Sequence, residues 1–335
     1  MNNSNCILNV QDLSISFKTE FGIVNPVSNV SFSVKKNEIL GIVGESGCGK
    51  SVTAYSILRL LPNNSILGEK TRIEFEGENI LAYDKNELAN VRGEKISMIF
   101  QEPMTSLNPI YTVGWQLAES FILHRKMTED EIHRESMALL EKVRIPEPEK
   151  RLKEYPHQLS GGMRQRVMIA MALACQPRLL IADEPTTALD VTTQAQILEL
   201  INDLKDRIDA SIILITHDLG VIAEMCDRVI VMYAGNIVEI GDVYEIFDHP
   251  GHPYTKGLMS SIPNIEIEKK DQRKLSTIKG YVPHPANFPK GCRFNPRCRF
   301  ASERCIRSNP ELFQVASGTT HYSRCWLEEK SGDDE

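Results

Sequence analysis

The chain has 335 residues, of which 41% are hydrophobic and 25% charged, enough for one large domain or for a domain with an extension. Its net charge of −7, from 38 basic and 45 acidic residues, argues against a general affinity for nucleic acid. No apolar run approaches the length that crosses a bilayer, and the N-terminus lacks the basic and apolar pattern of a secretory signal. We therefore expect a cytoplasmic protein that reaches a membrane only through a partner.

Predicted strands alternate with predicted helices along most of the chain. Residues 7–18 alternate apolar and polar side chains, as a half-buried strand does, and residues 30–34 repeat the pattern. Buried strands are expected at the short apolar runs 39–43, 96–100, 179–182 and 212–215. Helices are expected at about 51–61, 110–143, 162–174 and 192–207. This alternation predicts an α/β fold in which helices cover a parallel sheet.

The periodic pattern weakens near His249-Pro250-Gly251, and frequent prolines follow. We therefore place a domain boundary near residue 250, with residues 1–250 as the main domain and residues 251–335 as a small irregular C-terminal domain. Half of the eight cysteines crowd this second domain. In a reducing compartment such a cluster points to metal or redox chemistry.

A glycine-rich motif follows the predicted strand 39–43 and opens the next helix. It consists of Gly44, Glu45, Ser46, Gly47, Cys48, Gly49, Lys50 and Ser51, followed by Val52, and fits the P-loop pattern. Glycines let backbone N–H groups turn inward around phosphates, and the helix N-terminus adds a favourable dipole. We expect Lys50 to reach the β- and γ-phosphates and Ser51 to ligate Mg²⁺. The alternative, a glycine-rich turn with an incidental Lys-Ser pair, is disfavoured by the strand–loop–helix context.

A second motif carries two carboxylates to the end of the predicted strand 179–182, where phosphate sites in such sheets lie. Asp183 suits the Mg²⁺ shell, directly or through water. Glu184 could orient a water that attacks the γ-phosphate, and general-base help of this kind contributes roughly 10²–10⁴-fold. Two acids after a strand could merely cap the next helix, but a preceding P-loop favours the catalytic interpretation.

Between these motifs the run LSGGMRQR, residues 159–166, resembles the signature of the ABC family, with Met163 in place of the more usual Gln. Other elements of that family occur in the expected order. They are Phe17 for stacking on adenine, with Phe21 a less favoured candidate, Gln101 of the Q-loop, Ala188, Leu189 and Asp190 of the D-loop, and the switch histidine His217. So many elements in one order make a coincidental match negligible.

The resemblance implies an ATP-hydrolysing P-loop domain of ABC type. Its RecA-like parallel-sheet core would carry an antiparallel β subdomain and a helical subdomain at about 105–175. Gln101 and Asp183 would join Ser51 around Mg²⁺, and Lys50, Gln101, Glu184 and His217 would form the catalytic set. In that family two domains pair head to tail, so that Ser160, Gly161, Gly162 and Asp190 of one chain complete the nucleotide site of its partner.

Residues beside these motifs indicate one subgroup of the ABC family. Residues 101–109, the turn Tyr155-Pro156-His157-Gln158 and the motif His252-Pro253-Tyr254-Thr255 are similar to ATP-binding subunits of dipeptide/oligopeptide importers. The implied partners are a homologous ATPase, two permease subunits reached through a groove near Gln101, and an extracytoplasmic binding protein. The chain would then work at the cytoplasmic face of the membrane.

Other functions stay open at this point. Nickel and other small-solute importers of the same group share these features. A soluble ABC ATPase is less favoured, because only about a hundred residues without sustained heptads separate Lys50 from Ser160. A degenerate nucleotide binder is disfavoured by the intact Lys50, Glu184 and His217.

The C-terminal cysteines have the spacing C-x5-C-x6-C-x19-C, which fits neither the usual zinc pairs nor the common ferredoxin spacing. Their surroundings are basic, as negative thiolate clusters favour. The basic residues are Lys290, Arg293, Arg297, Arg299, Arg304 and Arg307, against Glu303 alone. The resemblance implies a [4Fe–4S] cluster on Cys292, Cys298, Cys305 and Cys325; zinc and buried thiols without metal remain alternatives. We expect its role to be structural or redox-sensing, with no route to the phosphate chemistry.

Overall fold

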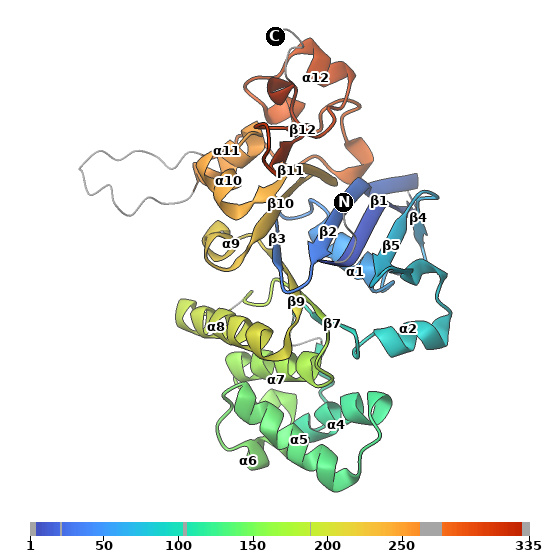
Figure 1. The fold of residues 1–335 in the computed structure, drawn as a ribbon, viewed down its shortest axis with the longest axis vertical. Coiled ribbons are helices and arrows are strands. Elements are labelled where there is room, and N and C mark those ends of the chain that lie inside the picture. Colours follow the sequence, from blue (N-terminus) through green and yellow to red (C-terminus); the bar gives the residue numbers. More distant parts are fainter. Residues whose placement is uncertain (1–4, 21, 103–105, 188, 262–276, 330–335) are drawn as a thin grey trace, which may run out of the picture. The chain divides into compact units, whose positions relative to one another are not determined.

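The computed structural model describes residues 5–20, 22–102, 106–187, 189–261 and 277–329 (Figure 1). The chain divides into two compact units. Unit 1 comprises Met1–Leu8, Val34–Glu38 and Glu74–Ile215, and unit 2 comprises Asn9–Ser33, Ile39–Ile73 and Thr216–Glu335. In the described part of the chain, no helix is both apolar enough and long enough for a membrane span.

Unit 1 is built on the parallel strands β7 (Ile96–Ile99), β8 (Leu179–Asp183) and β9 (Ser211–Thr216). Strand β8 pairs with β7 on one side and with β9 on the other. All three strands are buried along their whole length. Burial on both faces explains why they appear in the sequence as continuous apolar runs rather than as alternating ones. The α/β class, the positions of these strands and their parallel pairing agree with the prediction.

Helices make up most of the rest of unit 1. They are α2 (Lys85–Val91), α4 (Val113–His124), α5 (Glu129–Lys142), α6 (Pro148–Leu152), α7 (Gly161–Leu173) and α8 (Val191–Ile208). Figure 1 shows α4, α5 and α6 gathered beside α7, in green. The helical stretch predicted over 110–143 consists of two helices, α4 and α5. The second begins after Thr128, whose side chain forms a capping box with that of Glu131.

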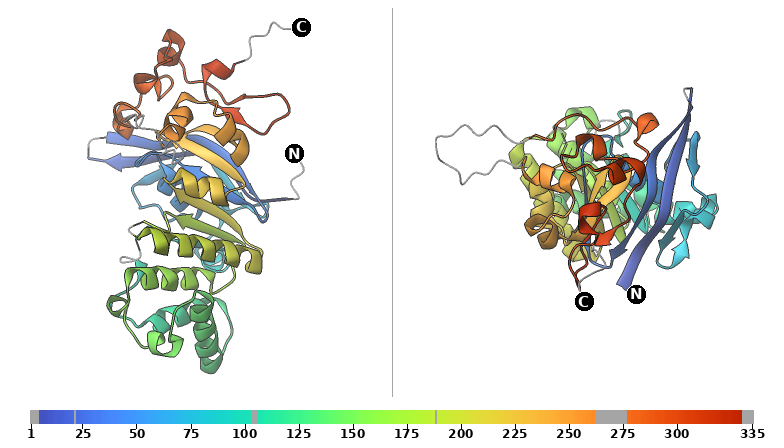
Figure 2. Two further views of the ribbon diagram at one scale, coloured as in Figure 1. Left: turned by 90° about the vertical axis from the view of Figure 1, so that its left-hand side faces the viewer. Right: turned by 90° about the horizontal axis from the view of Figure 1, so that it is seen from above.

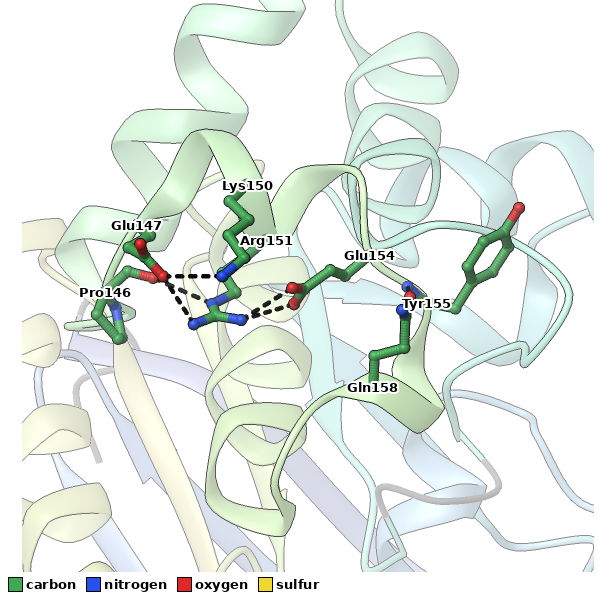
Figure 3. A network of polar contacts seen from close by, with 7 residues as sticks. All are labelled: Pro146, Glu147, Lys150, Arg151, Glu154, Tyr155 and Gln158. Carbon is green, nitrogen blue, oxygen red and sulfur yellow. Dashed lines mark hydrogen bonds and ion pairs between the residues drawn. The ribbon is translucent and has the colours of Figure 1, made fainter.

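A polar network fixes the chain just before α7 (Figure 3). The Arg151 guanidinium lies between two carboxylates, with both oxygens of Glu154 at 2.9 Å and one of Glu147 at 3.0 Å. The Arg151–Glu154 pair is only partly exposed, so its charge-assisted bonds are stronger than those of a surface pair. The following turn closes where Tyr155 N donates to Gln158 Oε1 at 2.8 Å. The entry to α7 is therefore held by side chains rather than left as a loose loop.

Unit 2 contains β3 (Ile39–Val43), which pairs in parallel with β10 (Arg228–Tyr233), and β11 (Asn236–Asp242), which runs antiparallel to β10. The C-terminal strands β13 (Tyr322–Ser323) and β12 (Phe313–Gln314) continue this sheet beyond β11. Figure 2 shows the C-terminal segment, in red, against the orange region of α10 and α11. The C-terminal region is thus joined to the sheet of its unit, and the boundary near residue 250 stays a prediction.

The N-terminal strands form a second sheet in the order β2-β1-β5-β6, with β4 paired antiparallel to β1. Their bounds are β1 (Cys6–Thr19), β2 (Gly22–Lys35), β4 (Ser65–Leu67), β5 (Arg72–Phe75) and β6 (Glu78–Asn79). The helices of unit 2 are α1 (Lys50–Ile57), α9 (Leu219–Met225), α10 (Val243–Asp248), α11 (Pro253–Met259) and α12 (Glu303–Arg307). Short 3₁₀ turns lie at Ile80–Ala82, Pro156–Gln158, Pro285–Asn287, Asn295–Arg297 (η5) and Trp326–Glu328.

A buried carboxylate ties the C-terminal segment to β11. Glu239 is fully buried and accepts hydrogen bonds from the backbone N–H groups of Gly251 at 2.6 Å and His252 at 3.0 Å. The ring nitrogen Nε2 of His321 lies 2.6 Å from the same carboxylate. A buried charge is tolerated when it is fully hydrogen-bonded, and removing one partner is costly. The start of α11 and the segment before β13 are therefore anchored to one side chain.

The His252 side chain makes stability depend on pH. Burial lowers the pKa of His252 from 6.5 to about 4, and its Nδ1 accepts from Tyr254 N at 3.0 Å, which requires the neutral ring. Between pH 6.5 and pH 4 the unfolded chain binds a proton that the folded chain does not, so stability falls as the pH falls through this window. His252→Asn keeps the cap and removes the titration, and should lose about 1.5 kcal/mol less between pH 6.5 and pH 5 than the parent. Urea unfolding of both proteins at the two pH values measures this difference; equal losses would contradict it.

Candidate active site

The P-loop of unit 2 connects the buried strand β3 to helix α1. Gly47 and Gly49 have φ angles of 78° and 105°, in the left-handed region that glycine adopts without strain. A Cβ on Gly49 would also lie 3.0 Å from the carbonyl oxygen of Pro26. Lys50 is buried, and its ammonium donates to the carbonyl oxygens of Gly44 at 2.7 Å and Glu45 at 3.3 Å. The sequence thus folds into a closed loop with a cation inside it, which suits a phosphate chain.

Cys48 fills space under the loop. Its side chain is fully buried, and burial raises the pKa of its thiol. Its carbonyl oxygen accepts from Gly235 N at 2.9 Å, which ties the loop to the turn between β10 and β11. A neutral buried thiol is a weak nucleophile, so the geometry gives Cys48 a packing role only.

The two carboxylates of the second motif lie at the end of β8 in unit 1. Asp183 is fully buried, and Glu184 follows with a φ of 45° while its N–H donates to Ile215 O at 2.9 Å. One oxygen of Glu184 accepts from Gln101 Nε2 at 3.0 Å and from Thr187 Oγ1 at 2.9 Å. The structure therefore brings together the predicted Q-loop residue and the predicted catalytic acid, which lie 83 residues apart in sequence.

The signature residues begin helix α7 in unit 1. Ser160 is the N-cap, and its Oγ accepts from Met163 N at 3.3 Å. This bond uses only the backbone of Met163, so the departure from Gln leaves the cap intact. Gly161 and Gly162 are the first helical residues, at a helix terminus whose N–H groups and dipole favour anions. Gln165 donates to Pro185 O at 2.5 Å and so connects α7 to the turn after Glu184.

The remaining predicted residues fall in both units. Asp190 caps α8 in unit 1, and hydrogen bonds from the Thr193 side chain and N–H lower the pKa of its carboxyl group. In unit 2, Phe17 is half-buried on β1 opposite Ser65, and the exposed His217 follows β9. Phe21, Pro103, Met104, Thr105 and Ala188 lie outside the described residues.

Two residues beside the P-loop were not predicted to act there. Tyr254 Oη accepts from Glu45 N at 2.8 Å, and the Arg297 guanidinium pairs with the Glu45 carboxylate. Tyr254 belongs to a motif that served only as a family marker, and Arg297 precedes a predicted cluster ligand. The structure thus shows a contact between the cysteine segment and the phosphate loop that the sequence did not predict. Pairing of β13 with β11 folds this segment back onto the unit that carries the loop.

The C-terminal cysteines line one cavity of about 270 Å³, together with aromatic side chains such as Phe294 and Trp326. These are Cys292, Cys298, Cys305 and Cys325. Burial raises the pKa of the Cys292 and Cys325 thiols to about 11, and neighbouring cysteines add to the rise. Across the described residues, no three or more His, Cys, Asp and Glu side chains are grouped so that they could hold a metal ion. The thiols therefore line a cavity and are not grouped closely enough to bind a single metal ion.

The two signature glycines differ in the room around them. A Cβ on Gly162 would lie 2.9 Å from Thr193 Cγ2, whereas one on Gly161 would meet nothing within 4 Å. We expect Gly162→Ala to be less stable than Gly161→Ala by about 1 kcal/mol, because only the first overpacks. Equilibrium denaturation of the purified chain measures both. Adding Thr193→Ser, which removes the crowding methyl group, should abolish most of the difference; if it does not, crowding is not the cause.

Comparison with known proteins identifies the family of the chain. Residues 27–187 match the ABC transporter family model, and residues 238–305 match the model for the oligopeptide/dipeptide transporter C-terminal region. The chain is 51% identical over 320 residues to the probable peptide ABC transporter ATP-binding protein y4tR of Sinorhizobium fredii, covering 96% of this chain and 94% of that one. It is 49% identical over 327 residues to the dipeptide transport ATP-binding protein DppD of Bacillus subtilis, covering 98% and 96%.

Solved structures agree with the fold. A dimeric ATP-binding cassette in a post-hydrolysis state, bound to ADP and Pi, matches with a TM-score of 0.64 at 27% identity over 70% of this chain and 98% of that one. The cbiO1 protein of Clostridium perfringens, part of an ABC transporter complex, matches with a TM-score of 0.62 at 27% identity, covering 73% and 92%. The chain belongs to the family of ATP-binding subunits of peptide ABC transporters.

Proposed function

We propose that this chain binds and hydrolyses ATP to power the import of dipeptides or oligopeptides through an ABC transporter. The observation that carries the proposal is the combination, in one chain, of an intact P-loop around Lys50 with the C-terminal region of oligopeptide/dipeptide transporters. Identity of about half over nearly the full length with peptide-transport relatives supports it. The peptide-transport relatives described above favour this proposal over a nickel importer or a soluble ABC ATPase.

The nucleotide would be bound by its phosphates. Inward N–H groups of the P-loop and the start of α1 bind the anionic chain, and Lys50 exchanges its bonds to loop carbonyls for bonds to the β- and γ-phosphates. Ser51, Gln101 and Asp183 carry the hydroxyl, amide and carboxylate oxygens that Mg²⁺ prefers, and so fit that ion. When bound, Mg²⁺ neutralises charge on the β- and γ-phosphate oxygens. Phe17 would stack on adenine.

Hydrolysis needs a water aligned with the γ-phosphate. In the proposal, the Glu184 carboxylate accepts a hydrogen bond from that water and draws off its proton as the oxygen attacks. Gln101 and Thr187 donate to a single oxygen of Glu184, which orients the carboxylate. His217, on the segment after β9, would donate to the γ-phosphate as charge develops there.

The chain would supply half of each of two nucleotide sites. Ser160, Gly161 and Gly162 lie at the exposed or half-exposed start of α7, and such a helix start can bind the γ-phosphate held by a partner's P-loop. The proposed partners are a homologous ATPase, two permease subunits and an extracytoplasmic peptide-binding protein, which places the chain at the cytoplasmic face of the membrane. ATP closes the pair and hydrolysis reopens it.

Glu184→Gln tests the catalytic assignment. The amide keeps the size and the hydrogen bonds of the side chain but cannot take a proton, so ATP should still bind while turnover falls about 10²–10⁴-fold. ATP binding and peptide-stimulated phosphate release are measured in the assembled transporter. Glu199→Gln is the control, because this exposed acid pairs with Arg144 on the surface and its substitution should leave both unchanged. Steady hydrolysis by the Glu184 variant would refute the assignment.

We further propose that the four cysteines hold a [4Fe–4S] cluster. A single zinc ion bound at about 2.3 Å by each sulfur would need sulfurs about 3.8 Å apart, whereas a cluster of several atoms suits thiols around a cavity. The raised thiol pKa values mean that metal must displace protons on binding. Arg304 lies at the cavity wall, with its guanidinium 3.6 Å from the Trp326 ring centroid and paired with the Glu329 carboxylate. The role proposed is structural or redox-sensing.

Anaerobic purification tests the cluster. The purified protein should be brown and contain about four iron atoms per chain. The Cys292→Ser variant should lose most of the iron and the colour. Cys226→Ser is the matched control, because this buried thiol belongs to α9's C-terminus and does not line the cavity. Iron assay and visible absorbance give the readout. A colourless preparation with one zinc per chain would reject the cluster in favour of zinc.

A further inference from the structure

The Arg297 side chain joins the cysteine segment to the P-loop. It leaves turn η5, and only 4% of it is exposed. Its Nη1 donates to Glu45 Oε2 at 2.6 Å and its Nη2 to Glu45 Oε1 at 3.0 Å. A two-bonded arginine–carboxylate pair of this kind fixes both orientation and distance. Burial of the arginine shields the pair from solvent, unlike the surface pairs of this chain.

The Arg297 guanidinium also forms hydrogen bonds to groups other than Glu45. Its Nε donates to Lys279 O at 3.0 Å and Nη2 donates to Ile278 O at 3.3 Å. Nη1 lies 3.4 Å from Tyr233 Oη on β10. The Arg297 guanidinium is therefore hydrogen-bonded to the C-terminal segment on one side and to the sheet on the other. Such a side chain has little freedom to follow Glu45 and instead dictates where Glu45 lies.

Glu45 in turn controls the phosphate-binding interior of the loop. Its N–H donates to Tyr254 Oη, while its carbonyl oxygen accepts from Cys48 N at 3.2 Å and from the Lys50 ammonium. Its carboxylate carries a negative charge on the loop that must bind an anion. Without a counter-charge this carboxylate would repel the phosphates. Pairing with Arg297 neutralises it and aligns the backbone at the same time.

The turn that carries Arg297 is also hydrogen-bonded to two of the four cysteines. The η5 turn lies between Cys292 and Cys298, and Arg297 directly precedes Cys298. Both Asn295 N, at 3.0 Å, and Asn295 Nδ2, at 2.7 Å, donate to Cys292 O. Cys298 N donates to Asn295 O at 3.3 Å. A shift of either cysteine therefore moves the turn from which Arg297 extends.

We infer that Arg297, in the C-terminal segment, is a positioning residue for the P-loop that raises its affinity for ATP. Its guanidinium neutralises the Glu45 carboxylate and fixes the backbone that carries it, so that the loop accepts the triphosphate. Without this pair the carboxylate is left without its counter-charge, and ATP binds more weakly. The inference rests on the nucleotide binding proposed above and adds a contribution of the C-terminal segment to it.

The variants follow from the charge argument. Arg297→Met keeps an unbranched chain but leaves Glu45 unpaired, and should weaken ATP binding on the order of tenfold. Arg297→Lys should restore part of the loss. Adding Glu45→Gln to Arg297→Met removes the uncompensated charge and should return the affinity to within about threefold of the parent. Arg299→Met is the matched control, because Arg299 also adjoins Cys298 but contacts the ring of Phe300.

Binding of a fluorescent ATP analogue to the purified chain is the measurement. In the assembled transporter the Arg297→Met variant should raise KM for ATP more than it lowers kcat. Parent-like binding by Arg297→Met, or a loss that Glu45→Gln fails to restore, overturns the inference. Absence of ATP binding by the parent would instead refute the proposed function itself.

Discussion

A phosphate-binding loop must hold its backbone N–H groups inward with few side chains of its own to pack, and this constraint organises unit 2. The glycines that make the turn possible contribute almost no buried surface. Rigidity therefore comes from outside: β3 is buried along its length, Gly235 donates to Cys48 O, and Tyr254 Oη accepts from Glu45 N. Each contact comes from a different segment. The loop is shaped by its surroundings at least as much as by its own sequence.

The C-terminal region is one of those surroundings rather than an appendage. Its strand β13 extends the sheet beyond β11, and the buried Glu239 binds both the start of α11 and His321 before β13. The same helix start presents Tyr254 to the P-loop. Because a buried, multiply bonded carboxylate is costly to disturb, α11 is fixed relative to β11 and hence to the loop. The motif His252-Pro253-Tyr254-Thr255 thus has a physical role, because His252 caps α11 and Tyr254 supports the nucleotide loop.

Local features were predictable from the sequence where one pattern allowed one structure. The strand at 39–43 agrees to the residue, because a fully buried apolar run is bounded by Glu38 and by the glycines of the loop. The helical stretch expected at 110–143 is present as two helices, and the capping box of Thr128 and Glu131 marks the start of the second. Residue types in the P-loop and after β8 indicated the chemistry. The pairing of Glu45 with Arg297 spans 252 positions and depends on how the C-terminal strands join the sheet, which no local pattern encodes.

An acidic residue inside an anion-binding loop is unfavourable on its own, and its presence needs a reason. Glu45 has one in Arg297: the buried guanidinium cancels the charge and, through two parallel bonds, fixes the carboxylate and the backbone that carries it. The arginine has a matching need, since burial of its charge without an acid would be costly. Each residue therefore offsets the unfavourable charge of the other. The folded cysteine-bearing segment therefore supports the loop that carries Glu45, through the pair with Arg297.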